Sequence, residues 1–248
     1  MVIRGYNLLS GNTKLSKSGD EYLLAGLSLA PHTYGYEGRV KMKNVCPDAT
    51  PGCIASCVLH WAGRTVMPDV RNAAARRKEL YFKDRPEFIR QLKADVSRVR
   101  EQAAKHGQIP FIRLNVGSDV HWEKVCPELF SENPDITFYD YTKNADRVGL
   151  PNYHLTFSRS ERNNGVNILK RGGNVAVVFN VKYDGPHHVY GELPRNYHGY
   201  KVIDGDLDDI RTPEFDGVGV VVGLRLKGTI AAKSRAIETG FAHTPRKR

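Results

Sequence analysis

Three of the four cysteines of this chain lie close together, in the segment NVCPDATPGCIASCVLHWAGR. They are Cys46, Cys53 and Cys57, and their spacing is C-x6-C-x3-C. Thiolates are strong ligands for soft metals, so three close thiolates could hold an iron–sulfur cluster with one open iron. They could also form a zinc site that is completed by His60, three residues past Cys57. The alternative without chemistry is three unrelated structural thiols.

Polar residues end or follow several short apolar segments that we expect to be strands. Asp119 comes just after FIRLN, and Asp140 and Lys143 lie within FYDYTK. A carboxylate at such a strand end could accept a proton, orient a substrate amine or bind a ribose hydroxyl. We therefore predict catalytic roles for Asp119, Asp140 and Lys143. Neighbouring polar side chains are expected to bind the substrate: Arg113, Asn115, Ser118, Trp122, Glu123, Ser158 and Arg159.

The same strand ends have plain structural interpretations. Gly117, Ser118 and Asp119 could form a turn with a helix cap, and Asp140 could simply pair with Lys143. We prefer a functional site because several polar strand ends occur in one chain.

The chain is strongly basic. It carries 37 lysine and arginine residues against 27 acidic ones, a net charge of +10. Such a surplus suggests a polyanionic partner, and we expect nucleic acid, DNA in particular. A basic protein without such a partner is the alternative. The residues expected at the interface are Arg71, Arg76, Arg77, Lys78, Arg162, Lys170 and Arg171.

The sequence also bounds the compartment and the domain organisation. No run approaches the ~20 apolar residues of a membrane span, and no secretory segment opens the chain. We therefore expect a protein of the reducing cytoplasm, without membrane contact, whose cysteines remain available for metal. The absence of a repeat or clear linker favours one domain over residues 1–248, with oligomeric state left open. Residues 1–68 would carry the cysteine segment, and residues 236–248 a basic tail.

Two helices are expected in the basic region between the cysteines and the first polar strand end. Residues 69–82 have helix-forming composition. A second helix is expected between Asp84, its cap, and Gly107, its stop, with Pro86 in the first turn. Its buried stripe would be Phe88, Leu92, Val96 and Val99.

Short apolar segments then recur at fairly even intervals, with helical or loop segments between them. Several are apolar almost throughout, which is typical of strands covered on both faces. The pattern predicts an α/β fold with a mostly parallel sheet, and the length suits a complete or partial TIM-like barrel. An open doubly wound sheet is the alternative. The expected strands are residues 111–116, 136–141, 153–158, 174–179, 201–203 and 217–224.

One acidic segment partly matches the spacing of a metal-binding loop. Residues 203–211, IDGDLDDIR, resemble a calcium loop in their acid spacing but lack the glutamate that would close it. We predict a turn with solvated carboxylates there.

Several motifs together resemble a family of phage-encoded gene products. They are GNTKL, the CP-x-A-T-x-G-C-x-x-x-C block, RLN-x-x-SD-x-x-WE, YDYTK and VVGL-x-x-KG. The cysteine block is also similar, more loosely, to phage members of the radical S-adenosylmethionine superfamily, where the usual spacing is C-x3-C-x2-C. That resemblance implies a [4Fe–4S] cluster on Cys46, Cys53 and Cys57, whose open iron binds the amino acid part of S-adenosylmethionine.

These observations lead to one main hypothesis and two alternatives. The main hypothesis is a barrel-like enzyme that modifies nucleic acid in the cytoplasm of an infected cell, with a cysteine-bound cluster or metal. The first alternative resembles the tRNA-guanine transglycosylases, with Asp119 and Asp140 as paired aspartates and the cysteines with His60 on zinc. The second is a non-catalytic protein that binds nucleic acid or a host protein.

Overall fold

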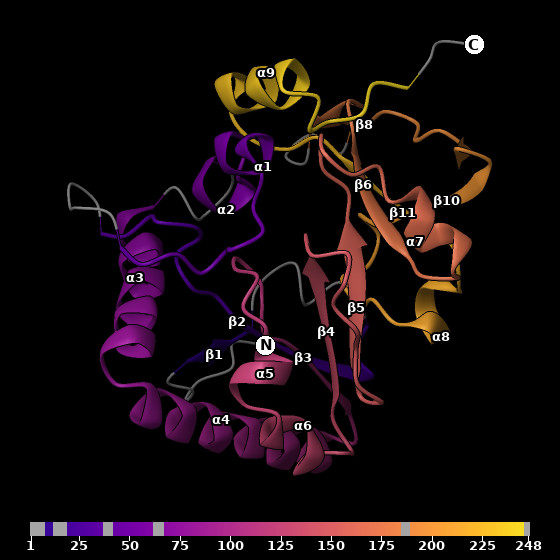
Figure 1. Cartoon of the computed structure of the whole chain (residues 1–248). Helices are drawn as coiled ribbons and strands as arrows, with labels where there is room; N and C mark the ends of the chain where they lie inside the picture. Colours follow the sequence, from indigo (N-terminus) through magenta and orange to yellow (C-terminus); the bar gives the residue numbers. More distant parts are fainter. Residues whose placement is uncertain (1–7, 12–18, 37–41, 62–66, 185–188, 246–248) are drawn as a thin grey trace.

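Apolar segments of the chain form a mostly parallel sheet (Figure 1). The computed structural model describes residues 8–11, 19–36, 42–61, 67–184 and 189–245. Within these ranges the sheet has nine strands, in the order β1-β2-β3-β4-β5-β6-β11-β10-β9. They are β1 (Leu9–Ser10), β2 (Tyr22–Leu27), β3 (Ile109–Arg113), β4 (Thr137–Thr142), β5 (Tyr153–Ser158), β6 (Val175–Phe179), β11 (Val221–Arg225), β10 (Tyr200–Asp204) and β9 (Asn196–Tyr197). A separate hairpin joins β7 (Tyr183–Asp184) to β8 (Val189–Tyr190).

The sheet is open, so the predicted α/β fold is confirmed but the TIM-like barrel is not. All neighbours from β2 to β10 pair in parallel, whereas β1 and β9 form antiparallel edges. Strands β2 to β6 follow chain order across the sheet, as in a barrel, but β11 precedes β10 and the described strands do not close on themselves. Parallel pairing brings the carboxyl ends of seven strands to one edge.

The two expected long helices are present as α3 (Pro68–Lys83) and α4 (Arg85–His106). Asp84 caps α4 by accepting a hydrogen bond from the Glu87 N–H at 3.0 Å, and Gly107 ends it with φ 65°. The shorter helices are α1 (Pro51–Ala55), α2 (Val58–Trp61), α5 (Trp122–Val125), α6 (Glu128–Ser131), α7 (Val166–Lys170), α8 (Pro213–Asp216) and α9 (Ile230–Glu238). No helix of the described ranges is long and apolar enough to cross a membrane.

The largest core lies between α4 and one face of the sheet. The predicted stripe of α4 is fully buried, and it packs in one cluster with Trp122 and Phe138. A smaller cluster on the sheet contains Leu24, Phe111, Tyr139 and Ile210. Because Ile210 follows β10, the acidic segment after that strand lies against the sheet rather than in solvent.

Helices α1, α2 and α9 gather at the end of the sheet toward which the arrows of β4 and β5 point (Figure 1). The Arg235 side chain of α9 donates a hydrogen bond to the Ala55 carbonyl at 2.8 Å, which ties α9 to α1. The expected basic tail 236–248 is therefore partly a packed element, since α9 extends to Glu238 and Ala242 is buried. Residues 246–248 lie outside the described ranges.

The prediction of solvated carboxylates in residues 203–211 is wrong. The Asp206 side chain is only 5% exposed and pairs with Arg225 at 3.1 Å and Lys227 at 2.5 Å. Asp209 is 13% exposed and pairs with Arg113 at 3.1 Å. Basic residues at the ends of β3 and β11 neutralise this segment, and one sequence window does not show which distant residues will face it.

Candidate active site

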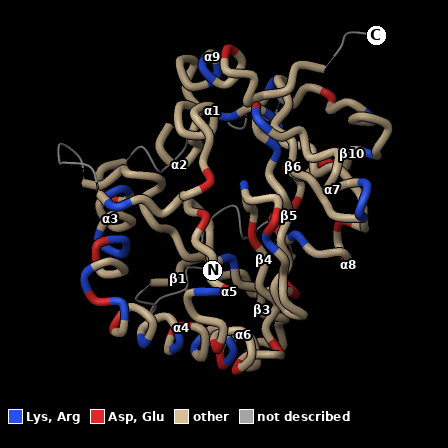
Figure 2. Tube along the Cα trace, in the orientation of Figure 1, with Lys and Arg blue, Asp and Glu red and all other residues tan. Residues whose placement is uncertain are grey.

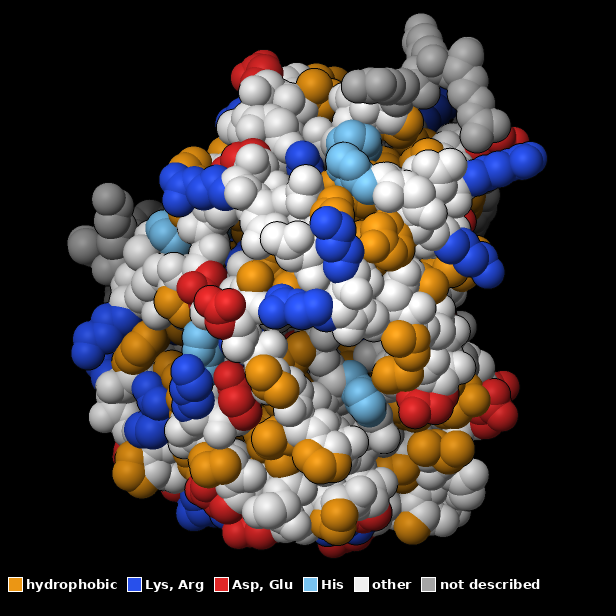
Figure 3. Space-filling model, turned by 45° about the vertical axis from the view of Figure 1, so that its right-hand side comes forward, with side chains coloured by type: hydrophobic (Ala, Val, Ile, Leu, Met, Phe, Trp, Pro, Cys, Tyr) orange, Lys and Arg blue, Asp and Glu red, His pale blue; other side chains and the backbone are white. Residues whose placement is uncertain are grey.

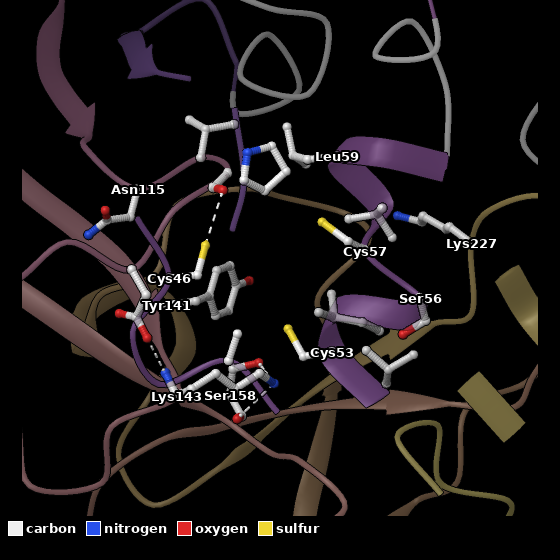
Figure 4. A pocket seen from close by; sticks show the side chains of 18 of the residues that line it. Cys46, Cys53, Ser56, Cys57, Leu59, Asn115, Tyr141, Lys143, Ser158 and Lys227 are labelled. Atoms are coloured by element: carbon white, nitrogen blue, oxygen red, sulfur yellow. Dashed lines mark hydrogen bonds between the residues drawn. The ribbon is translucent and has the colours of Figure 1, made fainter. Parts of the chain in front are cut away.

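A cavity of about 260 Å³ opens at the carboxyl edge of the sheet, and Cys46, Cys53 and Cys57 all line it (Figure 4). Figure 4 shows the three sulfur atoms directed toward the same space. Residues at or just after the ends of β3, β4, β5 and β11 form the other walls. The structure therefore brings the cysteine segment together with the polar strand ends.

The three thiols are protonated at neutral pH, because burial raises the pKa of each. The value reaches about 11 for Cys46 and about 12 for Cys57. The Cys46 sulfur also accepts a hydrogen bond from the His32 N–H at 3.2 Å and lies 3.7 Å from the Gly117 carbonyl, to which it donates. A metal bound here would displace these protons.

Helix α1 is fixed to the end of β5 by Glu161. The Glu161 carboxylate accepts hydrogen bonds from Thr50 Oγ at 2.8 Å and from the Gly52 N–H at 2.9 Å. Thr50 in turn caps α1 by accepting from the Cys53 N–H at 3.4 Å. A Cβ at Gly52 would lie 2.8 Å from the Glu161 carboxylate, so glycine permits this close approach. The chain of contacts positions Cys53 relative to the strand ends.

The donor set does not converge on a single ion. No group of three His, Cys, Asp or Glu side chains in the described ranges is arranged to hold one metal ion. His60 does not line the cavity, and its ring stacks on Tyr34 with centroids 3.7 Å apart. The fourth cysteine, Cys126, is buried in the large core beside α4 and also lies away from the cavity.

Lys143 lies at the cavity wall just after β4. Its ammonium donates to Ser158 Oγ at 2.8 Å and to the carbonyls of Ser158 and Arg159 at 3.0 and 2.7 Å. The alternative in which Lys143 simply pairs with Asp140 is wrong, because acceptors at the end of β5 engage the Lys143 ammonium. Burial lowers the Lys143 pKa, while the nearby Cys53 and Asp119 act in the opposite direction.

Asp140 lies beneath the cavity rather than on its wall. Its carboxylate is fully buried and accepts hydrogen bonds from the Asn115 N–H at 2.6 Å, Asn115 Nδ2 at 3.1 Å and the Tyr153 hydroxyl at 2.8 Å. Burial raises the pKa of Asp140 to about 7 against the opposing effect of these donors. In this geometry Asp140 positions Asn115, which does line the cavity.

Asp119 lines the cavity, but both of its carboxylate oxygens are engaged. One accepts from Arg147 Nη1 at 2.7 Å and the other from the Lys143 N–H at 2.8 Å. Arg147 also pairs with Glu123 at 2.7 Å, so one buried guanidinium serves two carboxylates. The helix-cap alternative for Asp119 is wrong, because His121 occupies the N-cap position of α5.

The expected substrate-binding residues divide into two groups. Arg113, Asn115, Ser118 and Ser158 line the cavity, whereas Trp122, Glu123 and Arg159 do not. Trp122 is fully buried and stacks near Phe88 in the core, because its aromatic ring faces α4. Arg159 donates to the carbonyls of Gly240 and Phe241 and so holds the chain after α9.

Sequence reasoning missed several further residues of the site. Tyr141, Arg225, Lys227 and Phe241 line the cavity, and Glu161 and Arg147 position its walls. Tyr141 lies in the YDYTK motif, between the predicted site residues Asp140 and Lys143. Its position in the sequence could therefore have identified it as a site residue. The contacts of Glu161 join residues 109 and 111 positions apart, which no local pattern reveals.

The residues expected to contact nucleic acid differ in how exposed they are to solvent. Arg76, Arg162, Lys170 and Arg171 are exposed. Lys78 is fully buried and donates to the His32 and Tyr34 carbonyls, so its assignment to the interface is wrong. The reason is that its side chain faces the loop that precedes Cys46. Arg77 is partly buried, and Arg71 donates to the His60 carbonyl at 2.8 Å.

Basic side chains are interspersed with other types in the parts of the described chain that the figures display. Along α3 and α4 they alternate with acidic ones (Figure 2). On the face that Figure 3 shows, they are scattered between acidic and apolar side chains. Lys170 and Arg171 line a second hollow of about 470 Å³ together with Asn163 and Asn167.

Comparison with known proteins gives one finding. A family model described as Gene product 88 matches residues 6–242. No curated protein and no solved structure matches the chain. The family match spans the whole cavity, from Pro31 to Phe241.

Proposed function

The chain belongs to the Gene product 88 family of phage gene products, and from this premise we propose that it is an enzyme that modifies nucleic acid. Its active site is the cavity at the carboxyl edge of the sheet. One observation carries the proposal: Cys46, Cys53 and Cys57 line the same cavity as Asp119, Lys143 and Ser158. Three soft ligands beside several polar groups, in a hollow at this edge, favour a catalytic centre.

The cofactor that fits best is an iron–sulfur cluster on the three cysteines. A cluster offers several iron atoms as separate attachment points, so its ligands surround a space rather than converge on a point. The three thiols surround the cavity without converging on one ion. Zinc with His60 has less support, because the His60 ring stacks on Tyr34 outside the cavity. When bound, such a cluster supplies an open iron for S-adenosylmethionine.

The protein's own residues then hold the site in place. Burial raises the pKa of Cys53, and the Lys143 ammonium partly offsets that effect by placing positive charge beside the thiol. Glu161 holds the first turn of α1, and Arg147 holds Asp119 at the cavity wall. Asp140 orients Asn115 from below. Asp140 is a positioning residue here, whereas Asp119 and Lys143 remain candidates for contact with substrate.

Nucleic acid is the substrate that the charge favours, and DNA in the cytoplasm of an infected cell is the target that we propose. The exposed residues Arg76, Arg162, Lys170 and Arg171 are the candidates for phosphate contact. If they bind phosphates, affinity falls as salt rises, because counterions are released on binding.

The transglycosylase-like alternative has less support. It needs two aspartates free at the cavity, but Asp140 does not line it and both oxygens of Asp119 are engaged. The non-catalytic alternative predicts that charge reversal at Arg76 and Arg171 abolishes function while the three cysteines can be replaced without effect.

Nucleoside analysis tests the proposed activity. DNA and RNA from host cells that express the wild-type chain are digested separately, and their nucleosides are compared by mass spectrometry. We expect a nucleoside of altered mass with the wild type and with the control Cys126→Ala. It should be absent with the triple variant Cys46→Ala, Cys53→Ala and Cys57→Ala. Identical nucleosides from wild-type and triple-variant cells would contradict the proposal.

A further inference from the structure

Tyr141 presents an aromatic ring to the cavity that the three cysteines line (Figure 4). It lies in β4, one residue before the strand ends, on the cavity side of Asp140. The remaining lining includes apolar side chains, among them Leu59, Val116 and Phe241. A flat ring in an apolar cavity is a suitable surface for a planar ligand.

The Tyr141 ring is held rigidly from two directions. The Arg113 guanidinium lies over the ring, 4.8 Å from its centroid, and Asp209 holds that guanidinium at 3.1 Å. The Tyr141 hydroxyl accepts a hydrogen bond from Arg211 Nε at 2.8 Å. Arg211 is 3% exposed and is itself fixed by Asp216 at 3.0 Å and by backbone carbonyls. The ring is therefore oriented before any ligand arrives, which lowers the entropy cost of stacking.

The surrounding polar groups suit the edge of a heterocycle. Ser158 Oγ accepts from Lys143, so its own proton can be donated to an acceptor in the cavity. Ser118, which also lines the cavity, still has an acceptor lone pair besides its bond to Asn115. Charged lining residues balance, four basic (Arg113, Lys143, Arg225, Lys227) against four acidic (Asp119, Asp206, Asp208, Asp209). This balance favours an uncharged ring over a phosphate inside the cavity.

We infer that Tyr141 is the stacking surface for one nucleobase, which enters the cavity unpaired. The inference rests on the proposed function and specifies its substrate. At about 260 Å³ the cavity lies just below the ~300–1,000 Å³ of common ligand pockets, so it takes one ring system and not a base pair. The base comes from a single strand, from a nucleotide flipped out of a duplex, or from a free nucleoside.

Binding measurements with defined probes test this inference. Titration calorimetry uses adenosine, guanosine, cytidine and thymidine, then a short single-stranded oligothymidine and the same oligonucleotide as a duplex. Stacking on an aromatic residue typically contributes enough that Tyr141→Leu should weaken base binding roughly 5- to 150-fold. Tyr141→Phe keeps the ring and should keep most of the affinity. Phe215→Leu is the control, because Phe215 is a partly exposed aromatic residue that does not line the cavity.

Comparison of the nucleosides with the oligonucleotides shows whether the base comes from a polymer or from a free nucleoside. Tighter binding of the oligonucleotide than of nucleosides identifies a polymer, and the reverse identifies a free nucleoside; both support the inference when they depend on Tyr141. In the wild type, a nuclear Overhauser contact between base protons and the Tyr141 ring gives evidence that requires no variant.

Unchanged affinity in Tyr141→Leu, or no binding of any probe, overturns the inference. Iron content measured on the same preparations keeps this result separate from the proposed function. Iron-loaded wild type with Tyr141-independent binding overturns the stacking inference alone. Tyr141-dependent base binding by a chain that never acquires iron overturns the cluster and leaves the inference standing.

Discussion

Single residues set the chemical state of the cavity. Burial keeps the thiols of Cys46 and Cys57 protonated far above neutral pH. Their state differs from that of reactive cysteines, whose pKa is lowered by nearby positive charge or a helix N-terminus. The raised pKa values therefore argue against Cys46 and Cys57 as nucleophiles at neutral pH, and a metal bound there would have to displace their protons.

Metal affinity should accordingly depend steeply on pH. Each bound thiol releases one proton, so affinity for a soft probe ion such as Cd²⁺ should rise as pH rises from about 6 to about 8, by up to tenfold per unit for each thiol. The sign follows from pKa values above this range, since rising pH reduces competition from protons. Titration of the metal-free protein at several pH values measures the slope. Cys46→Ala should reduce the slope, and a pH-independent affinity would argue against thiolate ligation.

Arg147, which holds Asp119 at the cavity wall, should be sensitive to substitution. Arg147→Met leaves Asp119 and Glu123 buried without their cation, which should cost about 3–5 kcal/mol of unfolding free energy. Arg90→Met is the matched control, since the Arg90 side chain is 69% exposed in its pair with Glu87 and should contribute far less. Urea denaturation compares the two. Equal losses of unfolding free energy in the two variants would contradict the expectation that the buried Arg147 pairs contribute more than the exposed Arg90 pair.

The sequence identified many residues of the site but not their contacts. Cys46, Cys53, Cys57, Asp119 and Lys143 were chosen for their chemistry and strand-end positions, and all of them line one cavity. Their catalytic and ligand roles remain predictions. Glu161, Arg147 and Tyr141 were missed because their importance lies in partners distant along the chain.

At the scale of elements, helix α1 depends on support from other parts of the chain. It has five residues and no acidic side chain in its first turn, so it has little intrinsic stability. Glu161, which follows β5, supports it from one side, the Thr50 cap begins it, and Arg235 of α9 holds the Ala55 carbonyl. Loss of Glu161 should therefore disturb the positions of the cysteines on and beside α1 more than it disturbs the sheet.

Glu161→Ala should lower metal retention while the fold survives. It removes two hydrogen bonds to the carboxylate, a loss of about 1–3 kcal/mol. Glu132→Ala is the control, because Glu132 forms an exposed pair with Lys93 at 2.9 Å. Iron content after gel filtration and the melting temperature give the two readouts. Equal iron in both variants would show that Glu161 does not position the cysteines.

The long helices and the apolar strands were predictable, and the short helices were not. The expected strands at residues 111–116, 136–141, 153–158, 174–179, 201–203 and 217–224 are confirmed as β3, β4, β5, β6, β10 and β11. Helix α4 follows from its cap, apolar stripe and terminal glycine, and it appears within a residue of the expected bounds. Helices α1 and α9 have N-caps at Thr50 and Thr229, but α1, α2 and α9 are too short to show an apolar stripe like that of α4. Contacts with one another help to hold them, from Arg235 to the Ala55 carbonyl and from the Thr229 N–H to the Trp61 carbonyl. The position of these three helices at the cavity could therefore not be predicted from the sequence.

For the molecule as a whole, parallel pairing explains how a site forms from distant segments. The carboxyl ends of β3, β4, β5 and β11 meet at one edge, and the cysteine segment lies across it. The α/β class followed from apolar segments, but their pattern is the same for an open and a closed sheet. Closure depends on which strands meet at the edges, and here β1 and β9 occupy the two edges as antiparallel strands.

Iron and acid-labile sulfide analysis of anaerobically purified protein tests the central claim most directly. The account predicts roughly four iron and four sulfide per wild-type chain, as in a [4Fe–4S] cluster. The content should be retained in Cys126→Ala and lost in Cys46→Ala, Cys53→Ala and Cys57→Ala, each tested singly. An iron-free wild type, or a triple cysteine variant that keeps its iron, would contradict the account.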